Sequence, residues 1–217
     1  MIKIKSFTFN PFDENTFLLW SESNRESIVI DPGMSNENEE KIFDEFLNNE
    51  GLNLTRILNT HCHIDHILGC KYVKEKYSTE YLIPEGDLLL LEHYEKQMSI
   101  VGVEMEEPPK PDILIKETDT IKLNGSIIKP LLTPGHTPGE MCYYLEDENF
   151  CITGDVLFKG SIGRTDLWGS DTSAILNSIK TKLLTLDDSV TIYPGHGDKS
   201  TIGEEKKTNP FVLELLK

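Results

Sequence analysis

Histidines and an aspartate gather in one short segment of the chain. His61, His63 and His66 lie within six positions, with Asp65 among them, although the 217 residues include only 6 histidines. Side chains two residues apart on an extended backbone point the same way, so His61 and His63 could bind one cation. Asp65 and His66 follow the bend and could face a neighbouring cation. Buried imidazoles without polar partners would be costly, so we predict a metal site.

Three further candidate ligands follow predicted strands elsewhere in the chain. His136 and His196 each come after a Pro-Gly pair, in which proline ends strand pairing and glycine permits a turn that exposes the histidine. Asp155 follows Gly154 at the end of another apolar run. Each signal alone is weak, because Pro-Gly and Gly-Asp are ordinary turn pairs. Together with the first segment they complete a set of seven nitrogen and oxygen ligands.

Seven ligands exceed the four of one tetrahedral ion, but they suit two ions that share a bridging carboxylate and a water. The predicted division is His61, His63 and His136 for one ion, Asp65, His66 and His196 for the other, and Asp155 as the bridge. Five imidazoles favour zinc, iron or manganese over calcium or magnesium. We expect two divalent ions, with zinc preferred and iron or manganese as alternatives.

Two other residues of metal-ligand type are set aside. Cys62 lies between two of the histidines, but cysteine is commonly a small buried residue. His93 lies in a predicted helix beside an apolar run and is interpreted as an ordinary helical residue. The chain has 4 Cys and no Cys-x-x-Cys pair, so we expect free thiols and a cytoplasmic location.

Strands and helices are expected to position these ligands, and they alternate along the chain. In the first half the predicted strands cover 2–9, 16–20, 27–31 and 55–59, and the predicted helices cover 36–50, 68–77 and 85–97. Asn36 is the expected cap of the first helix, with Glu39 three residues on and Gly51 as its end. The strand over 55–59 runs directly into the histidine segment.

The second half repeats this strand and helix material after about residue 115. Asn124-Gly125 predicts a two-residue hairpin turn. The predicted strands cover 120–123, 126–133, 141–145, 149–153 and 190–193. Ser170 or Asp171 is expected to cap a helix that carries Ile175, Ile179 and Leu183, and a short last helix is expected at Asn209-Pro210. The fold class is therefore mixed α/β.

The charge and the lengths of the apolar runs indicate which classes of partner the protein could bind. The formal net charge is −16, which opposes binding of nucleic acid, and no apolar run approaches the ~20 residues of a membrane span. Met1 to Lys5 alternates instead of forming a signal-peptide core. We expect a small-molecule substrate, no nucleic acid and no membrane partner, and the oligomeric state stays open.

The motifs resemble those of the metallo-β-lactamase fold superfamily, within its glyoxalase II-like hydrolase branch. The similarity spans almost the whole chain and includes the H-x-H-x-D-H motif within 60–69. The other resembling elements are 29–33, 133–139, 154–158, 163–166 and 194–197. The resemblance implies a four-layer αββα sandwich with two mixed sheets, and the ligand division above agrees with it. It also implies a single domain over 1–217 that lacks the C-terminal helical domain of full-length glyoxalase II.

The resemblance implies a hydroxyacylglutathione hydrolase-like enzyme that acts on a thioester of the S-lactoylglutathione class or a related ester. A metal-bridging hydroxide would attack the carbonyl, and Asp65 would orient it and take its proton. Arg164 stands where the family places a basic substrate contact, and an ion pair with Asp166 is the equally weighted alternative. Asp31 and Asp166 are expected to support the ligands from behind.

Other activities on this scaffold remain open to different degrees. In the lactamases proper a cysteine replaces the bridging aspartate, and flavin-linked diiron reductases carry Glu where this chain has His63, so both are disfavoured. Persulfide dioxygenases use one iron, held by the equivalents of His61, His136 and Asp155, and form the main alternative. A non-catalytic binding module would lack ligands, and none is missing.

Overall fold

The computed structural model describes residues 1–217 and divides them into two compact units. Unit 1 comprises Met1–Ile115 and Lys122–Ser126, and unit 2 comprises Lys116–Ile121 and Ile127–Lys217. Each unit has its own sheet, helices and core, and each is described in turn.

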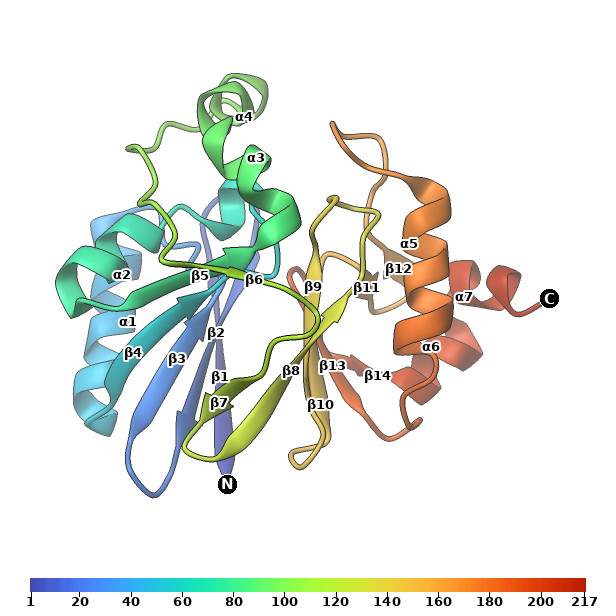
Figure 1. Cartoon of the computed structure of the whole chain (residues 1–217), viewed down its shortest axis with the longest axis horizontal. Coiled ribbons are helices and arrows are strands. Elements are labelled where there is room, and N and C mark those ends of the chain that lie inside the picture. Colours follow the sequence, from blue (N-terminus) through green and yellow to red (C-terminus); the bar gives the residue numbers. More distant parts are fainter. The chain divides into compact units, whose positions relative to one another are not determined.

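Unit 1 is built on a six-stranded mixed sheet with the order β1-β2-β3-β4-β5-β6 (Figure 1). Its strands are β1 (Ile2–Phe9), β2 (Glu14–Ser21), β3 (Glu26–Ile30), β4 (Asn53–Leu58), β5 (Glu80–Pro84) and β6 (Ile113–Ile115). The first three strands pair antiparallel, whereas β3 to β6 pair in parallel. Because parallel strands point the same way, the loops that follow β3, β4 and β5 leave from one edge of the sheet.

Helices cover this sheet and close its core. They are α1 (Glu37–Glu50), α2 (Cys70–Tyr77), α3 (Leu88–Glu92) and α4 (Tyr94–Val101), with short 3₁₀ turns η1 (Ile64–His66) and η2 (Glu85–Asp87). Phe43 and Leu47 of α1 and Val73 of α2 lie in one buried cluster with strand residues such as Val29 and Ile57. Full burial of such a side chain contributes roughly 1.5–3 kcal/mol, so α1 and α2 are held mainly by their apolar faces.

The predicted ends of α1 are confirmed, with one difference. Asn36 accepts hydrogen bonds from the backbone N–H groups of Asn38 and Glu39, and Gly51 ends the helix at φ 61°. The expected capping box would return the Glu39 carboxylate to its cap residue. Instead, Glu39 accepts from the N–H of Ser35 at 2.7 Å and from the N–H of Asn10 at 3.0 Å. The helix start is thereby joined to the β1–β2 turn.

The single helix predicted over 85–97 is wrong. The structure has η2, α3 and α4 in succession, and His93 lies between α3 and α4 with φ −103° and ψ 28°. Its Nδ1 donates to the Leu89 carbonyl at 2.8 Å, which ends α3 with a side-chain bond that periodicity does not reveal. The helix predicted from Leu68 begins at Cys70, because η1 and a further turn take up the preceding residues.

The tip of the predicted hairpin is confirmed and belongs to unit 1. Asn124 and Gly125 both have positive φ, as this two-residue turn requires. Asn124 Nδ2 donates to the hydroxyls of Ser21 and Ser23 at 2.7 Å each, and Arg56 Nη2 donates to the Lys122 carbonyl at 2.5 Å. These bonds join residues more than sixty positions apart into one unit.

The second six-stranded mixed sheet has the order β14-β13-β10-β9-β8-β7 and belongs to unit 2 except for its hairpin tip, residues 122–126. Its strands are β7 (Ile121–Leu123), β8 (Ser126–Leu132), β9 (Met141–Leu145), β10 (Phe150–Gly154), β13 (Thr191–Pro194) and β14 (Ser200–Thr201). A small ribbon of β11 (Leu157–Phe158) and β12 (Ser161–Ile162) follows β10. Strands β10 and β13 pair in parallel, so Asp155 and the Pro-Gly-His segment leave from the same edge.

The helices of unit 2 are α5 (Thr172–Ser178), the π-helical segment η3 (Ile179–Leu183), α6 (Ile202–Thr208) and α7 (Pro210–Leu215). Asp171, one of the two expected caps, accepts from the N–H of Ala174. The predicted long helix widens to a π-helix at Ile179, yet Ile175, Ile179 and Leu183 all remain buried against Ile192. Asn209 caps α7 as predicted.

The predicted mixed α/β fold with two mixed sheets covered by helices is confirmed. All four cysteines are buried free thiols, as expected. None of the helices is both long and apolar enough to pass through a bilayer.

Candidate metal centre

The start of the loop after β4 is hydrogen-bonded to Asp31, a buried aspartate directly after β3. Asp31 Oδ1 accepts from the Thr60 N–H at 2.7 Å and from Asn59 Nδ2 at 3.1 Å, and Asp31 Oδ2 accepts from the Thr60 hydroxyl at 2.7 Å. Asp31 is fully buried and sits at φ 51°, a conformation that Asp tolerates better than most residues. These bonds fix the point from which the histidine segment leaves the sheet.

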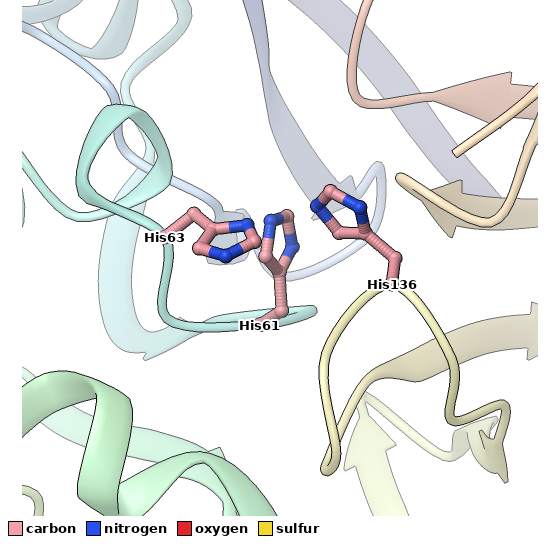
Figure 2. Close-up of side chains that lie close together, drawn as sticks. All are labelled: His61, His63 and His136. Atoms are coloured by element: carbon pink, nitrogen blue, oxygen red, sulfur yellow. The ribbon is translucent and has the colours of Figure 1, made fainter. Parts of the chain in front are cut away.

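Within unit 1 the predicted ligands do come together, and we call them the unit 1 cluster: His61, His63, Asp65 and His66. The rings of His61 and His63 are perpendicular with centroids 4.9 Å apart, and those of His61 and His66 lie 4.1 Å apart. Figure 2 shows the His61 and His63 rings rising from the loop after β4, and the His136 ring on its own loop after β8. His61 and His66 are fully buried, whereas His63 is half-buried.

The two ring nitrogens of His66 face different carboxylates. Nδ1 lies 3.2 Å from Asp31 Oδ2, and Nε2 lies 3.7 Å from Asp65 Oδ2. A carboxylate beside Nδ1 favours the tautomer that carries its proton there and leaves Nε2 as the ligand atom. Asp31 belongs to a group with His61 and His66 whose ligand-type atoms lie within 4.8 Å of one another. Because both Asp31 oxygens already accept hydrogen bonds, its position suits the predicted supporting role.

Asn10 of the β1–β2 turn and Glu14, the first residue of β2, also support the unit 1 cluster, and neither was predicted. Asn10 Nδ2 donates to the carbonyls of Gly33 and Asp65 at 2.9 Å each. Glu14 is fully buried, accepts from the Thr16 hydroxyl at 2.9 Å, and places Oε1 3.9 Å from His66 Nδ1. Burial raises the pKa of the Glu14 carboxyl well above its usual range. In the sequence both look like ordinary turn residues.

Unit 2 contains a second group of predicted ligands, the unit 2 cluster: His136, Asp155 and His196. Asp155 Oδ2 lies 3.5 Å from His136 Nε2 and 3.7 Å from His196 Nε2, so one carboxylate oxygen faces two imidazole nitrogens. His136 Nδ1 donates to the Arg164 carbonyl at 2.8 Å, which leaves Nε2 as its ligand atom. The Asp155 carboxylate therefore lies close to both rings.

Main-chain contacts hold the unit 2 cluster. The Asp155 N–H donates to Glu140 Oε1 at 2.7 Å, and the Gly195 N–H donates to the Gly154 carbonyl at 2.8 Å. Glu140 is fully buried directly before β9 and was not predicted. A Cβ on Gly163 would lie 1.8 Å from the Asp155 carbonyl oxygen, so glycine is needed for this close approach.

Arg164 and Asp166 form the ion pair that was one of the two readings of Arg164. Arg164 Nε and Nη2 donate to Asp166 Oδ1 and Oδ2 at 2.6 and 2.8 Å, and both side chains are exposed. The Arg164 guanidinium lowers the pKa of Asp166. Asp166 therefore has an indirect link to the unit 2 cluster: it binds the side chain of Arg164, and the carbonyl of Arg164 accepts the hydrogen bond from His136.

The chemistry of both clusters fits divalent transition metals. Each cluster combines imidazole nitrogens with carboxylate oxygens in a largely buried setting, and in each a second polar group fixes the ring that would bind. Cys62 is different, because burial raises the pKa of its thiol well above the usual range and opposes the thiolate that a metal requires. The clusters thus contain metal-binding residues of histidine and aspartate type.

Comparison with known proteins gives a consistent relationship. The family model of the metallo-beta-lactamase superfamily matches residues 9–196. The hydroxyacylglutathione hydrolase GloC of Haemophilus influenzae is 35% identical over 213 residues, which are 97% of this chain and 98% of that protein. The solved structure of BLEG-1 B3 metallo-beta-lactamase is similar with a TM-score of 0.89 and 30% identity, over 97% of this chain and 99% of that one.

A second solved structure, TTHA1623 in a di-iron-bound form, is similar with a TM-score of 0.84 and 33% identity, over 95% of this chain and 99% of that one. The family match covers most of the chain, and the fold and the ligand motifs agree with it. The chain belongs to the metallo-β-lactamase superfamily and is a hydrolase of that superfamily.

Proposed function

We propose that this protein is a dinuclear metal-dependent hydrolase of glyoxalase II type, which cleaves thioesters of the S-lactoylglutathione class or related esters. The observation that carries the proposal is the single oxygen of Asp155 that faces the Nε2 atoms of both His136 and His196. The 35% identity to a hydroxyacylglutathione hydrolase supports the substrate class.

The proposed ligand sets draw on both clusters. One ion would take His61, His63 and His136, the other would take Asp65, His66 and His196, and Asp155 would bridge them. Zinc is the expected metal because imidazole and carboxylate ligands suit it, with iron or manganese as alternatives. A similar protein solved in a di-iron-bound form keeps iron in consideration.

The chain's own groups have distinct roles in this proposal. Divalent ions would supply an acidified water and polarise the substrate carbonyl. The Asp65 carboxylate, which faces His66 Nε2 through Oδ2, would orient that water and accept its proton. The Arg164 carbonyl keeps His136 in the tautomer with a proton on Nδ1. The exposed guanidinium of Arg164 would meet an anionic group of the substrate.

Metal removal tests the proposal. The purified protein is analysed for metal, stripped with a chelator, assayed with S-lactoylglutathione and simple thioesters, and then reloaded with zinc, iron or manganese. We expect two ions per chain, loss of hydrolysis on stripping, and recovery on reloading. Full hydrolysis by the stripped protein would contradict the proposal.

Metal content and activity measurements also distinguish the proposed hydrolase from the main alternative, a persulfide dioxygenase. A persulfide dioxygenase-like enzyme would hold one iron per chain and consume oxygen with glutathione persulfide. That result, together with no thioester hydrolysis, would replace the hydrolase proposal.

We also propose that the enzyme works on a small molecule in the cytoplasm. Four buried free thiols suit a reducing compartment, and the formal net charge of −16 opposes nucleic acid as a partner.

A further inference from the structure

One glutamine of α4 pairs with the backbone on both sides of His63. Gln97 Oε1 accepts from the Ile64 N–H at 3.0 Å, and Gln97 Nε2 donates to the Cys62 carbonyl at 3.0 Å. The amide therefore binds the residue before His63 and the residue after it. Gln97 is 33 positions away from Ile64 in sequence, and it is not one of the predicted ligands.

The same amide is also hydrogen-bonded to α3. Gln97 Nε2 also donates to the Leu90 carbonyl of α3 at 2.9 Å, and Leu90 is itself a buried core residue. Asp87 adds a second anchor, since its Oδ2 accepts from the Cys62 N–H at 3.1 Å and its side chain is fully buried. The peptide groups that flank His63 are thus joined to the core through the segment 87–97.

The helix that carries Gln97 has few other attachments. No residue of α4 is buried, and Ile100 and Val101 are exposed. A helix without a buried apolar face gains little from packing, so the hydrogen bonds of Gln97 are a main link between α4 and the rest of unit 1. His63, in turn, is the half-buried histidine of the unit 1 cluster, so fewer core contacts hold it than hold the fully buried His61 and His66.

We propose that Gln97 is a positioning residue for His63, and that occupancy of the ion held by His63 and the docking of α4 stabilise each other. This inference rests on the proposed function, because it assigns His63 to a metal ion. Loss of a supporting partner behind a ligand typically weakens metal binding by about 10–100-fold. Coupling between two parts of a protein is reciprocal, so bound metal must also hold α4 more firmly.

The test compares Gln97→Leu with Ser99→Ala as a matched control. Ser99 lies on the same helix, is exposed, and its hydroxyl bonds only within the helix, to the Lys96 carbonyl. Zinc binding is measured by competition with a chromophoric chelator, which resolves the two affinities. For Gln97→Leu we expect one zinc affinity to fall by about 10–100-fold and the other to stay within about threefold of wild type. Ser99→Ala should match wild type at both.

Amide hydrogen exchange supplies a readout that needs no activity. In the metal-free protein, the Ile64 N–H should exchange faster in Gln97→Leu than in wild type or Ser99→Ala. Adding zinc should slow exchange over Tyr94–Val101 in wild type and much less in Gln97→Leu. If the Leu variant fails to fold, Gln97→Glu carries the test, because it keeps an acceptor for Ile64 and loses both donated bonds.

The outcomes separate this inference from the proposed function. Wild-type protein that binds two zinc ions, with Gln97→Leu equal to it in both affinities and in exchange, would overturn the role of Gln97 alone. Wild-type protein that binds no zinc, iron or manganese would overturn the proposed function and this inference together. Loss of one zinc affinity with faster exchange at Ile64 would support both.

Discussion

The unit 1 and unit 2 clusters are held by different kinds of support. In unit 1, buried side chains surround the ligands: Asp31 and Glu14 lie beside His66, and Asn10 holds the Asp65 carbonyl. In unit 2, each supporting bond involves the main chain: the Arg164 carbonyl holds His136, the backbones of Gly154 and Gly195 are bonded together, and the Glu140 carboxylate holds the Asp155 N–H.

This difference teaches how each cluster should respond to change. A substitution behind the unit 1 cluster removes a polar partner and leaves a buried group without its bond. A substitution near the unit 2 cluster acts mainly by pushing the main chain, because the backbone itself sets the ligand positions. Four variants, two of them with a matched control variant, can break or sharpen this comparison.

Asp65→Asn should have the largest effect. The amide keeps the size of the side chain but cannot take up a proton from water, so we expect turnover to fall by about 10² or more. Thermal unfolding should stay close to wild type, since Asp65 is not deeply buried. Because Asp65 is also a proposed ligand, the assay is run with zinc in excess so that both sites are filled. Turnover of thioester by the zinc-loaded variant measures the effect. Turnover within about threefold of wild type would remove Asp65 from its proposed role.

Asp31→Ala tests the side-chain support of the unit 1 cluster. It deletes the acceptor for three hydrogen bonds and the neighbour of His66 Nδ1, so we expect a loss of about 3 kcal/mol in unfolding free energy and about 10–100-fold weaker metal binding. Urea denaturation and chelator competition measure the two effects.

Asp166→Ala is the matched control for Asp31→Ala in unit 2. Its partner Arg164 is exposed, and an exposed ion pair contributes about 0–1 kcal/mol. Equal losses in the two variants would mean that the contrast between side-chain and main-chain support is wrong.

Gly163→Ala tests the main-chain support of the unit 2 cluster. Its Cβ would lie 1.8 Å from the Asp155 carbonyl oxygen, so the Asp155 backbone must move, at a cost of about 3 kcal/mol. Gly160→Ala, in the same ribbon, meets nothing within 4 Å and should cost only about 1 kcal/mol for its φ of 73°. Denaturation and zinc affinity are measured for both, and similar values in the two variants would argue against a packed contact at Asp155.

Asp44→Asn should have the smallest effect on the clusters, because it breaks a network that joins α1 to α2 and includes no predicted ligand. Burial raises the pKa of Asp44, but hydrogen bonds from Lys76, Tyr72 and Tyr77 outweigh it and lower the pKa below its usual value. We expect a loss of about 2 kcal/mol in unfolding free energy at pH 7, with zinc affinity unchanged.

The pH dependence of that loss follows from the sign of the shift. A carboxyl whose pKa is lowered by folding stabilises the protein above its unfolded pKa, near 3.8, and this stabilisation disappears as the pH falls through the folded pKa. The difference between wild type and Asp44→Asn should therefore shrink between pH 5 and the acid limit. Denaturation curves at a series of pH values measure it, and a constant difference would contradict the assignment.

The sequence predicted those features that depend on local signals. Strand ends, glycine turns and helix caps such as Asn36 and Asn209 each depend on a few adjacent residues. The candidate ligands could be predicted for the same reason, because they come directly after predicted strands. The π-helix at Ile179 was not predicted, because its apolar spacing is also that of an ordinary helix.

The supporting residues could not be predicted, because each depends on partners far away in the chain. Asn10 bonds to a carbonyl 55 positions away, and Gln97 bonds to an amide 33 positions away. No periodicity or motif marks such a residue, and Glu140 looks like a solvent-exposed acid beside a turn. Only the folded arrangement reveals that its carboxylate holds the Asp155 backbone.

The hairpin tip at Lys122–Ser126 has a consequence for how the protein can be divided. The polypeptide passes from one unit to the other at residues 115–116, 121–122 and 126–127, so neither unit is a continuous stretch of chain. A fragment that stopped at residue 115 would deprive Arg56, Ser21 and Ser23 of bonds they make with that tip. Neither the N-terminal nor the C-terminal half of the polypeptide therefore contains all the residues of one unit, and the protein is best expressed as one chain.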